Sequence, residues 1–379
     1  MTLGDADQLG QFGHLNLWIL GNLHGNMTVV AQECPTHIAN IPEVEMRYFI
    51  SCIIFPMTTL EMISTNLLSV PVLAFVLGVL ACRFKTNLKV SEGAFEAISF
   101  VLLLGIGLKG GHALKSSSVT TALPPVLSTL AIGIIIPALV FLVLKLVKGL
   151  TTTDRGAIAA HYGSTSLVTF TAALVFLDAS QIKYEGIVTT LLVMMEIPGI
   201  LVGILLARGG WAALKNKTLV HEIFFGKTVL LLLGGVLIGV LTSEESFAKV
   251  SPLFADAQPG LLTLFLLTLG VKAGASLPEF KKLGVPLAFA GVAVPVFAGL
   301  LGSALGTLAG LSVGGATALA VLAASASYIA APAAVGIALP DAKQGLPITM
   351  SLGLTFPFNL AIGLPLYLWF AELFAGWLH

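Results

Sequence analysis

Two hydrophobic segments of the chain are each interrupted near their middles by a small, hydroxyl-rich motif. The first motif reads His161-Tyr-Gly-Ser-Thr-Ser-Leu-Val-Thr-Phe170, and the second reads Ala324-Ser-Ala-Ser-Tyr-Ile-Ala-Ala-Pro-Ala-Ala334. In lipid, backbone groups released from a helix must find partners inside the protein, so such interruptions are costly. Paired interruptions at matching places in two halves of a membrane chain indicate a transporter's binding site. We therefore expect a substrate to bind at these two motifs.

The chemistry that two opened helices offer is anion binding. A helix that restarts inside the membrane presents free N–H groups and about half a positive charge at its N-terminus. Gly163–Ser166 and Ser325–Tyr328 add hydroxyls, and Pro332 removes an amide after the second motif. Two such half-helices would hold a small planar anion without a buried arginine. The alternative is that the Ser and Thr hydroxyls bond to carbonyls one turn earlier inside intact helices.

Glu196 is the most diagnostic single residue. About ten apolar residues flank it on each side, which places it near the bilayer centre. An acid there costs at least about 2.5 kcal/mol, and such residues are functional by default. Pro198 frees a carbonyl nearby, and Thr355 and Asn359 flank Pro357 at the same depth. These oxygens suit Na⁺; the alternatives are proton coupling and a protonated Glu196 bonded to a neighbouring helix.

The composition of the chain requires a bilayer. Of its 379 residues 56% are hydrophobic and only 10% are charged, with a mean hydropathy of +0.98, whereas soluble domains have about 25% charged residues. Zero net charge argues against a nucleic-acid partner. Cys34, Cys52 and Cys82 lack metal-ligand spacing, so no transition metal is expected. No HExxH motif and no phosphate-binding loop is present, so we expect neither an enzyme nor an organic cofactor.

Ten segments are apolar and long enough, or nearly so, to cross a membrane, which takes about 20 residues. They are residues 66–82, 93–112, 122–147, 156–177, 184–207, 227–242, 259–276, 284–308, 313–339 and 346–374. The odd-numbered connections between them carry thirteen Lys and Arg residues, and the even-numbered ones carry three. This asymmetry places the odd connections in the cytoplasm. We predict a multi-pass protein of the cell (inner or plasma) membrane.

Internal similarity indicates a duplication. Gly107-Leu-Lys-Gly-Gly-His-Ala-Leu114 is similar to Gly270-Val-Lys-Ala-Gly-Ala-Ser-Leu277. Five spans in each half would give the halves opposite orientations, as in transporters with inverted repeats. The predicted fold is all-α, with ten transmembrane helices in two inverted five-helix repeats and broken helices at the midplane. The predicted regions are an N-terminal extension of unknown role (1–64), a first repeat (65–208), a cytoplasmic linker (209–226) and a second repeat (227–379).

These features together resemble the sodium-dependent bicarbonate transporter family (SbtA-like). The resemblance begins near Asn66 and runs to the C-terminus. Its most specific parts are Ala159-Ala-His-Tyr-Gly-Ser-Thr-Ser, Ser325-Ala-Ser-Tyr-Ile-Ala-Ala-Pro-Ala-Ala and Ser351-Leu-Gly-Leu-Thr-Phe-Pro-Phe-Asn-Leu. The resemblance implies a homotrimer in which a core domain moves against a gate domain by an elevator mechanism. It also implies a PII-like cytoplasmic regulator as a candidate partner.

The resemblance further implies which residues of this chain would hold the cargo. The implied bicarbonate contacts are Gly163, Ser164, Thr165, Ser166, Ser325, Ala326, Ser327, Tyr328, Ala330 and Ala331. The implied Na⁺ ligands are Glu196 and Asn359 with the hydroxyls of Thr355, Thr169, Ser166 and Ser327. From the resemblance we expect the shorter Asp at the position of Glu196 in some relatives, and the longer arm here would then alter the geometry or number of the cations.

We therefore predict a Na⁺-coupled bicarbonate symporter that works by alternating access. A rival hypothesis keeps the machinery, with Na⁺ or H⁺ coupling, and changes the cargo to another small anion such as a monocarboxylate. From a different class, an intramembrane hydrolase would use Ser164 as nucleophile with His161 as base. A receptor or scaffold that transports nothing is a further alternative.

Overall fold

The computed structural model describes residues 17–21, 27–31, 64, 66–84, 86, 88, 91–115, 119–210, 215–276 and 280–378. The chain divides into two units, Met1–Pro56 and Met57–His379. In the first unit, β1 (Leu17–Gly21) pairs with β2 (Met27–Ala31) in an antiparallel hairpin. These strands were not predicted from the sequence. The rest of the predicted extension 1–64 lies outside the described residues, apart from Ser64.

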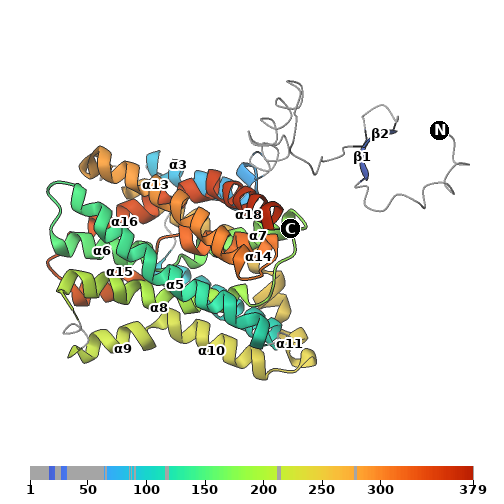
Figure 1. The fold of residues 1–379 in the computed structure, drawn as a ribbon, viewed down its shortest axis with the longest axis horizontal. Coiled ribbons are helices and arrows are strands. Elements are labelled where there is room, and N and C mark those ends of the chain that lie inside the picture. The colour runs from blue at the N-terminus through green and yellow to red at the C-terminus, as the bar shows by residue number, and fades with distance from the viewer. Residues whose placement is uncertain are drawn as a thin grey trace, which may run out of the picture. The chain divides into compact units, whose positions relative to one another are not determined.

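The second unit is built of helices throughout its described part (Figure 1). The α-helices are α3 (Val70–Arg83), α4 (Glu92–Leu114), α5 (Val119–Val143), α6 (Thr152–Gly163), α7 (Leu167–Ala179), α8 (Val188–Arg208), α9 (Lys217–Phe225), α10 (Lys227–Leu241), α11 (Glu244–Ser251), α12 (Gln258–Ser276), α13 (Phe280–Leu308), α14 (Val313–Ala324), α15 (Ala330–Ala338), α16 (Gly345–Met350), α17 (Phe356–Phe358) and α18 (Leu364–Leu378). Shorter helical turns are η2 (Leu144–Leu146), which is 3-10, and η4 (Pro252–Asp256), η6 (Ser351–Thr355) and η7 (Asn359–Gly363), which are π-helical. The predicted all-α class is confirmed for this unit.

Each of the ten segments predicted to cross the membrane is helical over most of its length. Seven helical stretches of the described chain are long and apolar enough to cross, or eight if α9 and α10, bent by 42°, form one span. The helices α3 and α14 are apolar but shorter. The chain is therefore a multi-pass membrane protein, and the number of ten spans stays a prediction.

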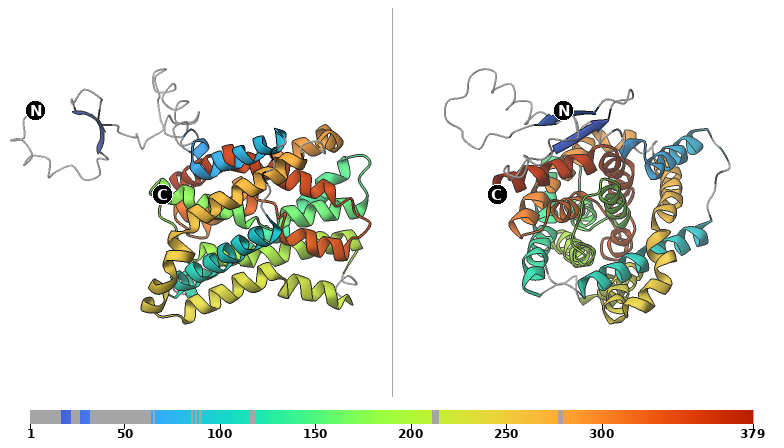
Figure 2. Two further views of the ribbon diagram at one scale, coloured as in Figure 1. Left: turned by 180° about the vertical axis from the view of Figure 1, so that it is seen from behind. Right: turned by 90° about the vertical axis from the view of Figure 1, so that its right-hand side faces the viewer.

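The helices of this unit pack in pairs through glycines. Several helices are seen almost end-on in the right panel of Figure 2, and the main pairs include α3 with α12 and α4 with α10. A Cβ on Gly270 would lie 3.0 Å from the Cα of Gly78, and a Cβ on Gly107 would lie 2.9 Å from the Cα of Gly235. Lipid offers helices no hydrophobic drive to associate, so close backbone packing of this kind holds the pairs together.

The second part of the predicted linker 209–226 is a packed helix. Leu219 and Ile223 of α9 are 1% and 2% exposed and join a buried cluster with Ala331 and Ala334 of α15. A helix that buries one face in this way is part of the folded body and not a free tether.

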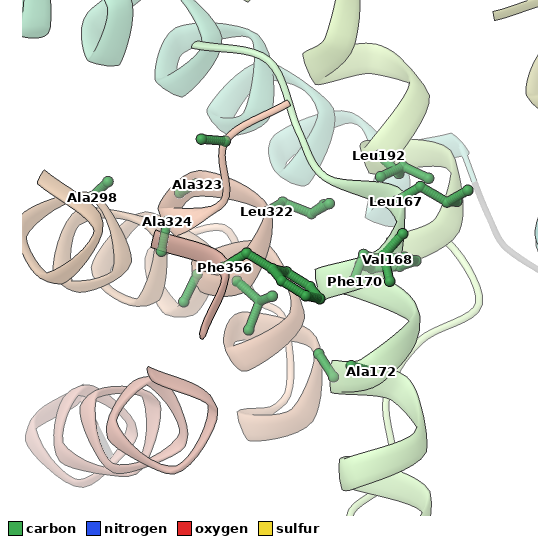
Figure 3. Packing of buried hydrophobic residues seen from close by; sticks show 14 of the residues in the cluster. Leu167, Val168, Phe170, Ala172, Leu192, Ala298, Leu322, Ala323, Ala324 and Phe356 are labelled. Carbon is green, nitrogen blue, oxygen red and sulfur yellow. The ribbon is translucent and has the colours of Figure 1, made fainter. Parts of the chain in front are cut away.

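The largest buried hydrophobic cluster lies directly beside the two interrupted motifs (Figure 3). Phe170 on α7, Leu322 on α14 and Phe356 on α17 belong to it, and none of the three is more than 1% exposed. Such close-packed interiors have little free volume and resist deformation. The motifs are therefore carried on a rigid support.

Candidate functional site

The first motif interrupts its helix. The helix α6 ends at Gly163 and α7 begins at Leu167. Between them Ser164 (φ −97°, ψ 156°) and Ser166 (φ −104°, ψ 109°) are extended. The Ser166 Oγ caps α7 by accepting a hydrogen bond from the Thr169 amide at 3.3 Å. The alternative of an intact helix is wrong for this segment.

The second motif is interrupted in the same way. The helix α14 ends at Ala324 and α15 begins at Ala330, with Ser325 extended at φ −84° and ψ 162°. The Ser327 Oγ accepts a hydrogen bond from the Ala331 amide at 3.1 Å. Pro332 lies in the first turn of α15, where the missing N–H would have had no partner within the helix. Gly, Ser and Pro thus open both helices where the sequence predicted.

The two interruptions cross each other. The Ser166 amide donates to the Ser325 Oγ at 2.9 Å, and the Ser327 amide donates to the His161 carbonyl at 2.8 Å. The Ser166 Oγ also donates to the Tyr328 Oη at 3.2 Å. Backbone groups freed in one helix are therefore satisfied by the other, as a low-dielectric environment requires.

A cavity of about 60 Å³ lies against both interruptions. About 10–15 Å³ of such volume holds one water molecule, so this cavity admits a group of a few non-hydrogen atoms. One wall comes from the interruptions and from α7, α8 and α15: Thr165, Ser166, Leu167, Glu196, Ser327, Tyr328, Ile329 and Ala330. The other wall comes from α4 and α10: Phe95, Glu96, Ser99, Leu103, Lys227 and Thr228.

The predicted bicarbonate contacts therefore divide into two groups. Those that line the cavity are Thr165, Ser166, Ser327, Tyr328 and Ala330. Those that lie in or beside the interruptions without lining the cavity are Gly163, Ser164, Ser325, Ala326 and Ala331.

Three polar atoms at the first interruption are buried without a hydrogen-bond partner in the described structure: Ser164 Oγ, Thr165 Oγ1 and His161 Nε2. Buried polar groups are normally paired, and an unpaired one calls for a ligand, ion or water. The other ring nitrogen of His161 pairs with the Ala157 carbonyl at 2.8 Å. Because Ser164 Oγ and His161 Nε2 do not bond to each other, the hydrolase alternative lacks its nucleophile–base contact.

Glu196 lies in the middle of α8 and its residue is only 3% exposed. Within the described part of the chain its carboxylate has neither a hydrogen-bond partner nor an ion pair. Its helix abuts the first interruption, because a Cβ on Gly199 would collide with the carbonyl of Gly163. A buried carboxylate without a partner is strongly disfavoured, so this group needs a cation or a proton.

The predicted cation ligands also fall into two groups, those that line the cavity and those that do not. Glu196, Ser166 and Ser327 line the cavity, whereas Thr355, Asn359 and Thr169 are buried and do not line it.

Thr355 and Asn359 are occupied by protein partners. The Thr355 Oγ1 donates to the Gly291 carbonyl at 2.7 Å and lies 2.7 Å from the Tyr162 Oη. The Asn359 Oδ1 accepts from the Tyr367 Oη at 2.7 Å, and its Nδ2 donates to the carbonyl of Ala324 at 3.0 Å. Both side chains hold the core together.

The wall formed by α4 and α10 was not predicted from the sequence. There Lys227 Nζ lies 2.5 Å from Glu96 Oε1. Lys227 was counted among the charges of a connection, although it begins α10 directly after the bend from α9. Glu96 is the only acid inside the predicted span 93–112, but it lies three residues from the start of that span, so the central depth that identified Glu196 did not identify it.

The chain matches the model of the Na⁺-dependent bicarbonate transporter superfamily over residues 71–372, about four fifths of its length. The matched region contains both interruptions, Glu196 and the Glu96–Lys227 pair. A comparison with curated proteins finds no match.

Proposed function

Because the chain belongs to the Na⁺-dependent bicarbonate transporter superfamily, as its motifs predicted, we propose that it is a secondary active symporter that couples bicarbonate entry to Na⁺. One observation carries the proposal: two interrupted helices cross beside a small cavity, and the unpaired carboxylate of the buried residue Glu196 lines the same cavity. This combination offers an anion site and a cation site side by side.

Bicarbonate would bind between the interruptions. The first residues of α7 and α15, Leu167 and Ala330, both line the cavity, so two helix N-termini with their partial positive charges border it. The unpaired hydroxyls of Ser164 and Thr165 supply further polar groups beside it. A small planar oxyanion accepts hydrogen bonds from such groups at each of its oxygens.

Na⁺ would bind at Glu196 with the hydroxyls of Ser166 and Ser327, the predicted ligands that line the cavity. A lone anion in a dry site is disfavoured, and a neighbouring cation offsets much of that cost. Each ion then raises the affinity for the other by the same factor. A tenfold Na⁺ gradient contributes about 1.4 kcal/mol per ion. No organic cofactor is needed, since Na⁺ is the coupling ion.

The proposed architecture is a ten-helix inverted repeat with a gate domain of α3, α4, α10 and α12 and a core domain of the remaining spans. In two five-span repeats, α3 corresponds to α10 and α4 corresponds to α12. The packing supports this architecture, because the pair α3–α12 then corresponds to the pair α10–α4, and both pairs are in close contact. The matched residues Gly107 and Gly270 each approach a glycine on the paired helix. Alternating access would move the core against the gate in a homotrimer of the cell membrane, with a PII-like regulator as a candidate partner on the cytoplasmic side.

Uptake into liposomes tests the function. The purified protein is reconstituted, and labelled bicarbonate is supplied at alkaline pH with an inward Na⁺ gradient, an inward K⁺ gradient or an inward H⁺ gradient. We expect accumulation with Na⁺ alone, and competition by unlabelled bicarbonate that exceeds competition by acetate. Bicarbonate accumulation that does not depend on the Na⁺ gradient contradicts the proposed coupling to Na⁺. Preferential acetate uptake contradicts the cargo and favours the monocarboxylate alternative.

A further inference from the structure

The cavity has one cationic side chain in its described lining, Lys227. Its Nζ lies 2.5 Å from the Glu96 Oε1 and 5.1 Å from the centre of the Phe100 ring. The side chains of Lys227 and Glu96 are 43% and 58% exposed, whereas Glu196 on the opposite wall is buried. The ion pair is therefore an exposed part of the cavity lining, and Glu196 is a buried part of it.

The pair belongs to the α4–α10 wall and not to the helices that carry the interruptions. Lys227 is the first residue of α10, directly after the 42° bend between α9 and α10. Glu96 lies in the second turn of α4, which packs along α10. An anion that enters beside the exposed part of the lining meets this pair before it reaches Ser166 and Ser327.

The chemistry of the pair suits exchange. The carboxylate of Glu96 presents two oxygens on a planar carbon, and so does the edge of a bicarbonate ion. A lysine ammonium is a point charge with three rotatable donors, so it accepts either partner without demanding bidentate geometry. An ion pair that is about half exposed is weak, because water screens it. Replacing one carboxylate-like group by another at Lys227 therefore costs little.

We propose that Lys227 admits the anion to the cavity and that Glu96 is its built-in competitor. An entering small oxyanion takes the place of the Glu96 carboxylate at Lys227 Nζ before it moves on to the interrupted helices. This inference rests on the proposed function and adds to it a pair of residues that determines anion affinity and specificity.

Two charge-removing variants test the inference, because it assigns them opposite effects. Lys227→Gln raises the KM for bicarbonate by about two- to fivefold, and Glu96→Gln lowers it by a similar factor. Neither variant changes the KM for Na⁺ measured at saturating bicarbonate. The matched control is Lys249→Gln on α11, which breaks the exposed pair with Glu245 (3.0 Å) away from the cavity; it leaves both KM values unchanged.

A merely structural ion pair predicts that Lys227→Gln and Glu96→Gln shift the bicarbonate KM in the same direction, and that result overturns the inference. Stabilisation of each purified variant by bicarbonate against thermal unfolding, with Na⁺ present, gives the same affinities without transport. If the wild type transports bicarbonate with Na⁺ but the two variants shift the bicarbonate KM in the same direction, this inference alone is overturned. Absence of Na⁺-driven bicarbonate uptake by the wild type overturns the proposed function as well.

Discussion

The backbone amide of Ser166 donates a hydrogen bond to the Oγ of Ser325, 2.9 Å away and 159 positions later in the chain. Both residues are buried, at 3% and 1% exposure. Each lies in an interrupted helix, where a backbone group has lost its partner one turn away. Unpaired backbone groups are not tolerated in lipid, so each interruption is stable only when it docks against the other. The site therefore forms by assembly of the two halves of the chain.

Ser325→Ala is expected to destabilise the protein and to weaken bicarbonate uptake. The substitution removes the acceptor of the Ser166 amide, and a buried donor left unpaired costs about 1–3 kcal/mol. Thermal unfolding in detergent measures the loss. Ser246→Ala, at an exposed position in the first turn of α11, is the control and changes the unfolding midpoint little. Equal midpoints for the two variants would contradict the role of the crossing bond.

The helix interruptions and the family could be predicted from sequence, because local chemistry decides them. Gly163, Ser164 and Ser325 occur in otherwise apolar segments, and glycine and serine both weaken a helix interior. The crossing could not be predicted. A hydrogen bond between Ser166 and Ser325 depends on how distant helices dock, and no local pattern records that.

The partners of the polar side chains in the last predicted span, residues 346–374, could also not be predicted from the sequence. Thr355 and Asn359 were predicted to face a cation together with Glu196, and that role stays a prediction. In the structure the Thr355 Oγ1 donates to the Gly291 carbonyl and the Asn359 Oδ1 accepts from the Tyr367 Oη. The chain around them forms two π-helical turns, η6 and η7. Each such turn adds a residue to the helical repeat and rotates later side chains away from the α-helical register. The helical segment could be predicted from the sequence, and the partners of these side chains could not.

Gly199→Ala is expected to abolish most transport and to lower stability. An added Cβ would collide with the backbone carbonyl of Gly163, and a backbone atom cannot yield as a side chain does. Overpacking of this kind costs about 1–3 kcal/mol, and it pushes Glu196 away from the first interruption. Uptake and thermal unfolding are measured together.

The matched control for that variant is Gly336→Ala in α15. An added Cβ there meets no atom within 4 Å. Alanine is favoured over glycine inside a helix by about 0.5–1 kcal/mol, so this variant is expected to be as stable as the wild type or more so, with normal uptake. If both glycine variants behave alike, close contact between α8 and the interruption is not what transport requires.

Glu196→Gln is expected to raise the KM for Na⁺ more than tenfold, a loss of more than about 1.4 kcal/mol, with little loss of stability. The side chain keeps its shape while the charge that would bind Na⁺ is removed. An uncharged amide is also less costly to bury than an unpaired carboxylate, so the unfolding midpoint without Na⁺ is expected to hold or rise. Glu372→Gln on α18, outside the cavity lining, serves as the control. An unchanged KM for Na⁺ removes Glu196 from the cation site.

Asn359→Asp separates a cation ligand from a residue that positions the core. If Asn359 is a Na⁺ ligand, the negative charge that this substitution adds would strengthen Na⁺ binding. In the structure, however, the Nδ2 of Asn359 donates to the Ala324 carbonyl at 3.0 Å, and an aspartate would place an oxygen against that carbonyl. A buried charge left unpaired in this way costs more than about 2 kcal/mol. We therefore expect a lower unfolding midpoint that added Na⁺ does not restore.

The comparison for this variant is Tyr367→Phe, which removes the hydroxyl that donates to the Asn359 Oδ1 at 2.7 Å. It loses one hydrogen bond without introducing a charge, so it is expected to cost only about 1 kcal/mol. If Asn359 positions the end of α14, both substitutions lower the midpoint and the aspartate lowers it more, with and without Na⁺. If Na⁺ instead raises the midpoint of Asn359→Asp by more than it raises that of the wild type, Asn359 belongs among the cation ligands after all.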